Sequence, residues 1–290
     1  MASLNLTVAA EPSAKLDDAT KAIGRFRNYL FARKGLSPNS VELHVGTIRR
    51  MVAKLGAFPS HEDLDGYVCD VRTAGSHSLV CNTMLAIERY QEFRGEPIHY
   101  GRPRKPQLIP EEVLTEAEIA ILLSTLNTLR KRAIVGLLAF TGIRNAEVCS
   151  LRIQDVDLAG GLVLVRRGKG DQAYAASIPS PCIRLLTDYL KERAGKPDDW
   201  LFLTRRKRQM QPQDLRKIVR VAARQVLDRR VHPHLFRHSL AMALANRGAH
   251  PISIQKQLGH RNLATTVNHY LRGNFVRARA EYLLNAPSFL

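Results

Sequence analysis

The chain has 290 residues, of which 45% are hydrophobic, so it is long enough to fold as one large domain or two ordinary ones. Its 44 lysine and arginine residues outnumber 26 acidic residues, and the resulting net charge of +18 indicates a polyanionic partner. No apolar run reaches the length of about 18 residues that a membrane span requires, and residues 1–15 lack the pattern of a signal peptide. We therefore expect an intracellular protein of the cytoplasm.

The cysteines and histidines give no sign of a metal site. The four cysteines, Cys69, Cys81, Cys149 and Cys182, are scattered and show neither CxxC nor zinc-ligand spacing. We interpret them as reduced thiols that are mostly buried. No histidine stands in an HExxH motif, so we expect neither a metal nor another cofactor.

The first part of the chain predicts an all-helical unit over residues 17–96, preceded by a loose leader over residues 1–16. The first apolar face at helical spacing is formed by Ile23, Phe26, Leu30 and Phe31. Ser37 and Pro38 then provide a cap and a first-turn proline for a second helix. Two further helices are expected over residues 62–74 and 78–94.

Residues 97–111 are predicted to form a linker between two domains. Four prolines between residues 95 and 110 exclude a continuous helix there. The same stretch carries the basic residues Arg102, Arg104 and Lys105. Such a charged linker is either simply solvated or follows a phosphate backbone.

Residues 112–290 predict a second, mixed unit. It starts with a capping box formed by Thr115 and Glu118, and Gly142 ends the apolar helix expected over residues 130–140. A short helix over residues 146–151 precedes a β-hairpin over residues 161–179. Helices follow, expected over residues 182–194, 213–227, 234–247 and 251–258, and over a last stretch that contains Tyr270 and runs to Leu284. The fold class is therefore mainly α with a small β-hairpin or sheet.

Two basic residues of this unit stand in unusual local settings. Arg144 follows the helix-ending Gly142, and Glu147 lies three residues on, where its carboxylate can hold the guanidinium. Lys169 stands between two glycines at the hairpin tip, where it can approach a phosphate closely. Taken singly, a surface ion pair and a polar hairpin tip explain them as well.

The last part of the chain adds two histidines, an arginine and a tyrosine. His234 and Arg237 lie three residues apart and so share a helix face, an arrangement that suits an oxyanion. His260 follows Gly259, which is placed to end a helix, and Tyr270 continues an apolar stripe. Singly, these residues are also compatible with a solvated basic turn and with an ordinary core tyrosine.

The order of these motifs resembles that of the tyrosine recombinase, or phage integrase, family. The matching segments are TGIRNAEVCSLRIQDVD, GKGDQ, HPHLFRHSLAMALANRG and IQKQLGHRNLATTVNHY. The segment KGLSPNSVELHVGTIRRM looks like part of the family's core-binding domain, which has a SAM-like fold. The resemblance covers most of the chain and points to compact Xer-like or transposon-resolution members. It implies a two-domain, C-shaped DNA clamp and a site-specific DNA recombinase.

The resemblance implies that Tyr270 attacks the scissile phosphate and forms a 3′-phosphotyrosine intermediate. Arg144 and Arg237 are then placed to stabilise the charge that develops on the non-bridging oxygens. Glu147 is expected to orient Arg144.

Three more residues acquire roles by the same resemblance. Lys169 would protonate the departing 5′ oxygen, and His260 would donate a hydrogen bond to the phosphate. His234 is a candidate base or hydrogen-bond partner for the proton of the tyrosine. The side chains thus take over work that a metal ion does in many nucleases, and the reaction is expected to need no metal.

Two features depart from the usual family pattern. The tyrosine commonly lies nine residues after the histidine of the Leu-Gly-His motif, whereas Tyr270 lies ten after His260 and His269 occupies the ninth position. On a regular helix this difference amounts to about 100° of rotation and about 1.5 Å of rise. Tyr282 lies too far along to replace Tyr270. Phe236, where leucine is usual, should alter only packing.

The expected partner is double-stranded DNA at a specific recombination site, contacted mainly through its phosphates. The candidate DNA-contacting residues are Arg49, Arg50, Arg102, Arg104, Lys105, Arg205, Arg206, Lys207 and Arg208. In related recombinases a C-terminal segment docks on a neighbouring protomer. Residues 271–290 either do the same or pack on their own domain.

The expected working state is a homotetramer on two DNA duplexes, or a heterotetramer with a sister recombinase. The protein would work at the nucleoid of a prokaryote. The length leaves no room for an added arm-binding domain, which favours resolution of dimers or cointegrates, although integration or excision of a mobile element stays open. Two rivals are a type IB topoisomerase-like enzyme, which would not need two partner sites, and a catalytically impaired architectural DNA-binding protein.

Overall fold

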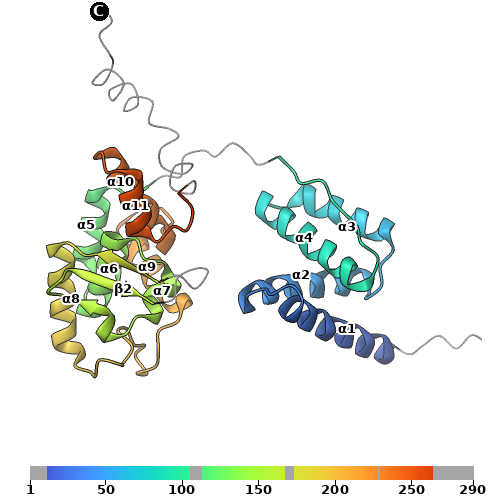
Figure 1. The fold of residues 1–290 in the computed structure, drawn as a ribbon, viewed down its shortest axis with the longest axis horizontal. Helices are drawn as coiled ribbons and strands as arrows, with labels where there is room; N and C mark the ends of the chain where they lie inside the picture. The colour runs from blue at the N-terminus through green and yellow to red at the C-terminus, as the bar shows by residue number, and fades with distance from the viewer. Residues whose placement is uncertain (1–11, 105–112, 167–172, 228, 264–290) are drawn as a thin grey trace, which may run out of the picture. The chain divides into compact units, whose positions relative to one another are not determined.

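The computed structural model describes residues 12–104, 113–166, 173–227 and 229–263. The chain divides into two compact units, Met1–Pro110 and Glu111–Leu290 (Figure 1). Each unit has its own clusters of buried hydrophobic residues. Within the described ranges, no helix is both long and apolar enough to cross a membrane.

In its described part the first unit is a bundle of helices: α1 (Pro12–Ala32), α2 (Pro38–Leu55), α3 (His61–Ala74) and α4 (His77–Arg94). Serine hydroxyls cap three of these helices, because Ser37, Ser60 and Ser76 each accept a backbone N–H from the first turn. Helix α1 begins at Pro12, whereas the expected leader extended to residue 16. The difference arises because the apolar periodicity that guided the expectation starts only at Ile23.

The core of this unit lies where α1, α2 and α4 pack together. Phe26 and Leu30 are fully buried, and the ring of Phe26 meets that of Tyr90 edge to face at 5.1 Å. Phe31, which was expected on the same face, is instead 59% exposed. A residue directly after Leu30 is rotated by about 100° around the helix, which turns its side chain away from the core.

The first half of the predicted linker is fastened to the first unit. The carboxylate of Glu88 accepts hydrogen bonds from the backbone N–H of Tyr100 (2.8 Å) and from both terminal nitrogens of Arg102 (2.9 and 2.5 Å). The hydroxyl of Tyr100 donates to Asp65, and Ile98 and Tyr100 pack against the core. Arg102 therefore has an acidic partner within its own unit.

The described part of the second unit combines helices with a small sheet. The helices are α5 (Glu116–Thr125), α6 (Leu129–Thr141), α7 (Asn145–Ser150), the 3-10 turn η1 (Ile153–Asp155), α8 (Ser180–Arg193), α9 (Pro212–Val226), α10 (Pro233–Asn246) and α11 (Pro251–Leu258). The strands are β1 (Val156–Asp157), β2 (Leu162–Val165) and β3 (Tyr174–Ser177). The expected class, mainly α with a small β-hairpin, is confirmed.

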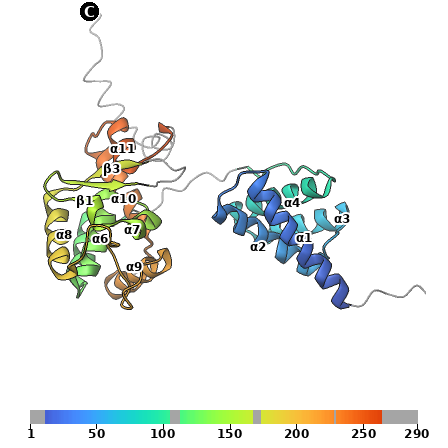
Figure 2. The ribbon, with the colours of Figure 1, turned by 60° about the horizontal axis from the view of Figure 1, so that its bottom comes forward.

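The strands form an antiparallel sheet in the order β1-β2-β3, with Val163 opposite Ala176. Val163 and Val165 point into the core while Leu162 and Leu164 point outward, as the two-residue period of a strand requires. Helix α11 packs beside β3 (Figure 2). The hairpin is thus confirmed, and its tip at residues 167–172 lies outside the described residues.

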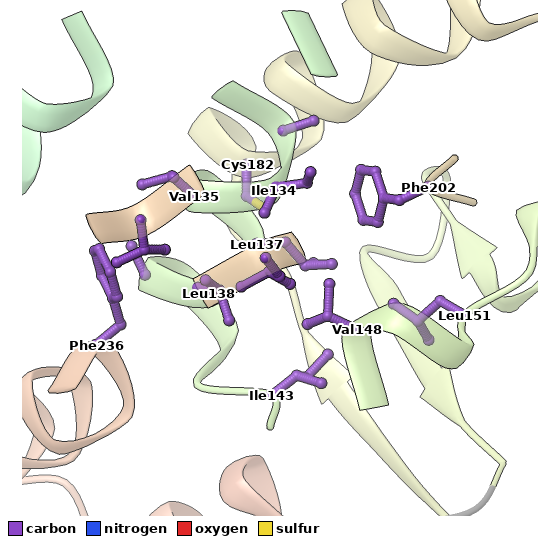
Figure 3. Close-up of a cluster of buried hydrophobic side chains, with 14 of the residues drawn as sticks. Ile134, Val135, Leu137, Leu138, Ile143, Val148, Leu151, Cys182, Phe202 and Phe236 are labelled. Carbon is purple, nitrogen blue, oxygen red and sulfur yellow. The ribbon is translucent and has the colours of Figure 1, made fainter. Parts of the chain in front are cut away.

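Helix α6 forms the centre of the second core. Every residue from Ala133 to Ala139 is buried, and Figure 3 shows its apolar side chains meeting Val148, Cys182, Phe202 and Phe236. A Cβ atom at Gly136 would lie 2.5 Å from the side chain of Leu185, so this glycine allows α8 to pack closely. A rigid α6 fixes where its C-terminus, and hence the segment after it, is placed.

All four cysteines lie in the described part of the chain, and none is paired in a disulfide. Cys149 and Cys182 are buried, as expected, whereas Cys69 is exposed and Cys81 is partly exposed. No group of three or more metal-ligating side chains is found among the described residues.

Candidate active site

The C-terminus of α6 places Arg144. Gly142 adopts a left-handed conformation (φ 65°) that ends the helix, and a Cβ atom there would lie 2.6 Å from the side chain of Leu258. The backbone N–H of Ile143 donates to the hydroxyl of Thr141, which stabilises the turn. Arg144 then takes an extended conformation as the residue before α7.

Glu147 binds Arg144 twice. One carboxylate oxygen accepts the backbone N–H of Arg144 at 2.9 Å, and the other accepts a terminal guanidinium N–H at 2.7 Å. The side chain of Glu147 is 5% exposed and that of Arg144 is 25% exposed. The guanidinium is therefore held in one pose but still reaches the surface, which suits the binding of an anion.

Arg237 of α10 is almost completely buried, with 2% of its surface exposed. Its two terminal nitrogens donate to the carbonyl oxygens of Gly142 (2.8 Å) and Leu258 (2.7 Å). These bonds tie α10 to the ends of α6 and α11. Carbonyls at a helix C-terminus lack partners within the helix and carry partial negative charge, so a guanidinium is a favourable partner for them.

The C-terminus of α11 joins the two arginines. Gly259 ends this helix in a left-handed conformation (φ 60°), and its carbonyl accepts a guanidinium N–H of Arg144 at 3.2 Å. The preceding carbonyl, of Leu258, is the one bound by Arg237. Both arginines thus bind successive carbonyls of one turn, and His260 is the next residue.

The two histidines belong to the same segments, because His234 lies three residues before Arg237 and His260 follows the turn that both arginines bind. His260 is partly buried, and its backbone N–H donates to the carbonyl of Gln255 at 3.1 Å, which continues the cap of α11. His234 is exposed in the first turn of α10, with its ring 4.9 Å from that of His238. Arg237 is one turn further along but points into the interior.

Tyr174, at the start of β3, belongs to the same cluster although the sequence analysis did not single it out. Its hydroxyl donates to Glu147 at 2.8 Å. Burial, and then the negative charge of Glu147, raises the pKa of Tyr174. One signal was present in the sequence: Tyr174 is the only aromatic residue of the second hairpin strand, in phase with Ala176 and Ile178, and an inward tyrosine needs a partner for its hydroxyl.

Two of the candidate catalytic residues cannot be placed in this cluster. Lys169 falls in residues 167–172 and Tyr270 in residues 264–290, and both ranges lie outside the described residues. The described site is thus built from Arg144, Glu147, Tyr174, Arg237 and the turn before His260.

The candidate DNA-contacting residues lie at separate places. Arg49 and Arg50 are exposed on α2, Arg104 is exposed after α4, and Lys105 lies outside the described residues. Residues 205–208 are exposed in a turn closed by the bridge between Leu203 and Gln209. Arg102 differs from the other candidates because its guanidinium forms an ion pair with Glu88 of its own unit.

Comparisons with known proteins show which family this chain is similar to. Residues 112–277 match the phage integrase family. Tyrosine recombinase XerA of Thermococcus kodakarensis is 31% identical over 259 residues, which cover 87% of this chain and 90% of that protein.

Two solved structures share the fold at lower identity. The Tn1549 transposon integrase in complex with transposon right end DNA superposes with a TM-score of 0.70 at 19% identity, covering 92% of this chain and 99% of that one. The XerH site-specific recombinase bound to difH gives a TM-score of 0.68 at 20% identity, with coverages of 94% and 97%. Because the family match spans residues 112–277 and the XerA relative covers most of the length, this chain belongs to the phage integrase family and is a tyrosine site-specific recombinase.

Proposed function

We propose that Tyr270 attacks a scissile phosphate of double-stranded DNA. A bond forms between the tyrosine oxygen and phosphorus, and the bond to the 5′ oxygen breaks, which leaves a 3′-phosphotyrosine and a 5′-hydroxyl. The observation that supports a phosphate at this site is the meeting of Arg144 and Arg237 on successive carbonyls at the end of α11. One positively charged site is therefore formed by three segments that are far apart in the sequence: Arg144 after α6, Arg237 of α10 and the C-terminal turn of α11.

The two arginines have complementary settings for this role. Arg144 is partly exposed and held by Glu147, so its guanidinium is fixed before a phosphate arrives. Arg237 is buried and fixes the ends of α6 and α11 while adding positive charge beneath them. Fixed donors stabilise a developing negative charge without having to reorganise during the reaction.

The remaining roles follow the family pattern. Lys169 protonates the 5′ oxygen as it leaves, His260 donates to the phosphate, and His234 accepts or shares the proton of Tyr270. These groups act without a metal ion. Relative to the family pattern, the additional residue between His260 and Tyr270 falls after Thr266 in the sequence.

The two units are proposed to divide the work. Residues 17–96 form the core-binding domain, residues 97–111 link it to the catalytic domain at 112–290, and the two close on DNA as a C-shaped clamp. The exposed arginines of α2 and the basic turn at 205–208 are proposed to contact phosphates. Since the pairing of Arg102 with Glu88 favours a structural role, Arg102 is the weakest of these candidates.

The working assembly is proposed to be a tetramer on two duplexes, with residues 271–290 docking on a neighbouring protomer. The similar proteins include a Xer recombinase bound to its difH substrate and an integrase bound to a transposon end. Resolution of dimers or cointegrates and movement of an element are therefore the two biological roles to distinguish, both inside a prokaryotic cell at the nucleoid.

The direct test uses a nicked suicide substrate that carries the native recombination site, sought in the DNA flanking the gene. The protein is incubated with this DNA in the presence of a chelator, and a denaturing gel reveals any covalent adduct. We expect an adduct with the unsubstituted protein and none with Tyr270→Phe, because phenylalanine cannot attack phosphorus.

Three other outcomes would change the assignment. An adduct that survives in Tyr270→Phe and disappears in Tyr282→Phe would move the nucleophile to Tyr282. Tight binding to a verified site without any adduct would favour the architectural DNA-binding protein. If cleavage and religation proceed at a single site with no need for a second duplex, the topoisomerase-like alternative is correct.

A further inference from the structure

Tyr174 contacts two parts of the proposed active site. It begins β3, and Ala173 separates it from residues 167–172, which include Lys169. Its hydroxyl donates to Glu147, and its ring lies against the turn at Gly259, where a Cβ atom would approach the ring to 2.5 Å. One side chain therefore touches the partner of Arg144 and the turn that precedes His260.

The hydrogen bond from Tyr174 changes how firmly Glu147 is held. One oxygen of Glu147 accepts both the backbone N–H of Arg144 and the hydroxyl of Tyr174, at 2.9 and 2.8 Å. The other oxygen accepts only the guanidinium of Arg144 among the described residues. Without Tyr174, the described donors to this carboxylate would all belong to Arg144, and the pair of side chains would keep only the 3.2 Å bond from Arg144 to the carbonyl of Gly259 among the described contacts.

A second contact, at Ser177, joins the C-terminal end of β3 to α11. The side-chain amide of Gln257 accepts the backbone N–H of Ser177 at 3.0 Å and donates to the carbonyl of the same residue at 3.1 Å. The strand is therefore bonded to the last turn of α11 at one end and packed against Gly259 through Tyr174 at the other. The hydroxyl of Tyr174 extends this frame to Glu147.

We propose that Tyr174 is a positioning residue for strand cleavage. It fixes Glu147, and through it the guanidinium of Arg144, relative to β3 and the turn that precedes His260. This inference rests on the roles proposed above for Arg144, Lys169 and His260. Tyr174 itself takes no part in bond making, because its hydroxyl is committed to Glu147.

The variant Tyr174→Phe removes the hydroxyl and keeps the ring against Gly259. We expect the single-turnover rate of adduct formation on the nicked substrate to fall roughly tenfold, as expected for losing one hydrogen bond to a charged group. The dissociation constant for the DNA should stay within about twofold, because the DNA-contacting surfaces are unchanged. An unchanged cleavage rate beside an active unsubstituted protein would overturn the inference.

Tyr189→Phe is the matched control. Tyr189 is another buried tyrosine of the second unit, and its hydroxyl donates to the carbonyl of Leu201 at 2.8 Å within the core. This variant should lose stability comparably but keep the cleavage rate. If both variants slow cleavage in proportion to their loss of thermal stability, Tyr174 is merely structural and the inference fails.

Glu147→Ala tests whether Tyr174 acts through Glu147. In that background Tyr174→Phe should cause no further loss of rate, because the hydroxyl no longer has its acceptor. Multiplicative losses in the double variant would show that Tyr174 acts by another route and would contradict the proposal.

A last measurement does not depend on cleavage, so it separates failure of this inference from failure of the proposed function. Nitrogen-15 NMR of the arginine side chains, with Arg144→Lys used for assignment, reports rotation of the Arg144 guanidinium in the full chain without DNA. Tyr174→Phe should make this rotation faster, whereas Tyr189→Phe should not. Equal rotation in all three proteins would overturn the positioning role even if no recombination site is found.

Discussion

The burial of Arg237 sets the character of the site at the level of single residues. A guanidinium that is 2% exposed is stable only if its donors meet acceptors, and two of these are the carbonyls of Gly142 and Leu258. The same charge that closes two helix ends also raises the positive potential at the turn before His260. Structure and proposed chemistry therefore depend on one side chain, and removing it would damage both.

His44 gives the stability of the first unit a predicted dependence on pH. It is buried in α2 with 4% of its surface exposed, and Arg89 of α4 donates to its Nε2. Burial, followed by the positive charge of Arg89, lowers the pKa of His44 from 6.5 to about 4. The unfolded chain therefore takes up this proton first as the pH falls, and stability is lost between about pH 6.5 and pH 4.

We expect this titration to remove up to about 3 kcal/mol from the free energy of unfolding of the first unit. Urea unfolding followed by hydrogen exchange across that pH range measures it. His44→Gln keeps an acceptor for Arg89 but does not titrate, so its stability should change less over the same range. Parallel pH curves for the two proteins would contradict the prediction.

At the scale of helices and strands, the site lies where the ends of several elements come together. The C-termini of α6 and α11, the first turns of α7 and α10 and the start of β3 supply its side chains and its carbonyls. Glycines at positions 142 and 259 let the chain turn sharply where the two arginines bind.

Much of this element map could be predicted from the sequence. Gly142 and Gly259 end helices as expected, and Thr115 and Glu118 form the expected capping box, because such signals are local. The contact of Tyr174 with Glu147, which joins residues 27 positions apart, is tertiary and depends on how β3 packs against α7 and α11. The two-residue period of the strand could have indicated that Tyr174 faces inward, but a local pattern does not identify the partner of its hydroxyl.

Gly259→Ala tests how much the end of α11 depends on its glycine. The added methyl group meets both a left-handed backbone (φ 60°) and the ring of Tyr174 at 2.5 Å. We expect the second unit to lose about 1–3 kcal/mol of unfolding free energy and cleavage to slow as Tyr174 is displaced. Chemical denaturation and the suicide-substrate assay measure the two effects.

Gly66→Ala is the opposite case. Gly66 lies within α3, where an added Cβ atom would have no neighbour within 4 Å and the backbone is helical. Alanine should therefore stabilise the first unit by about 0.5–1 kcal/mol through its better helix propensity. If Gly259→Ala is as harmless as Gly66→Ala, the close approach of Tyr174 to this turn does not constrain the protein.

At the scale of the whole molecule, no buried hydrophobic cluster of the described residues includes both units. The buried cluster around Phe26 and Tyr90 contains residues of the first unit only, and the one around α6 contains residues of the second only. Each unit has its own apolar periodicity in the sequence, which is a local pattern. How the units are arranged on DNA is a tertiary property that local patterns do not encode.

Separate cores predict separate unfolding. Phe26 is fully buried, so Phe26→Ala should remove about 3–5 kcal/mol from the first unit by leaving a cavity. Amide exchange in α1, α2 and α4 should quicken accordingly, while exchange in α6 and α8 of the full chain should stay as it is in the unsubstituted protein. Phe202→Ala, in the core of the second unit, should give the converse pattern. If either substitution accelerates exchange equally in both units, the chain unfolds as one cooperative body, and each unit depends on the other for its stability.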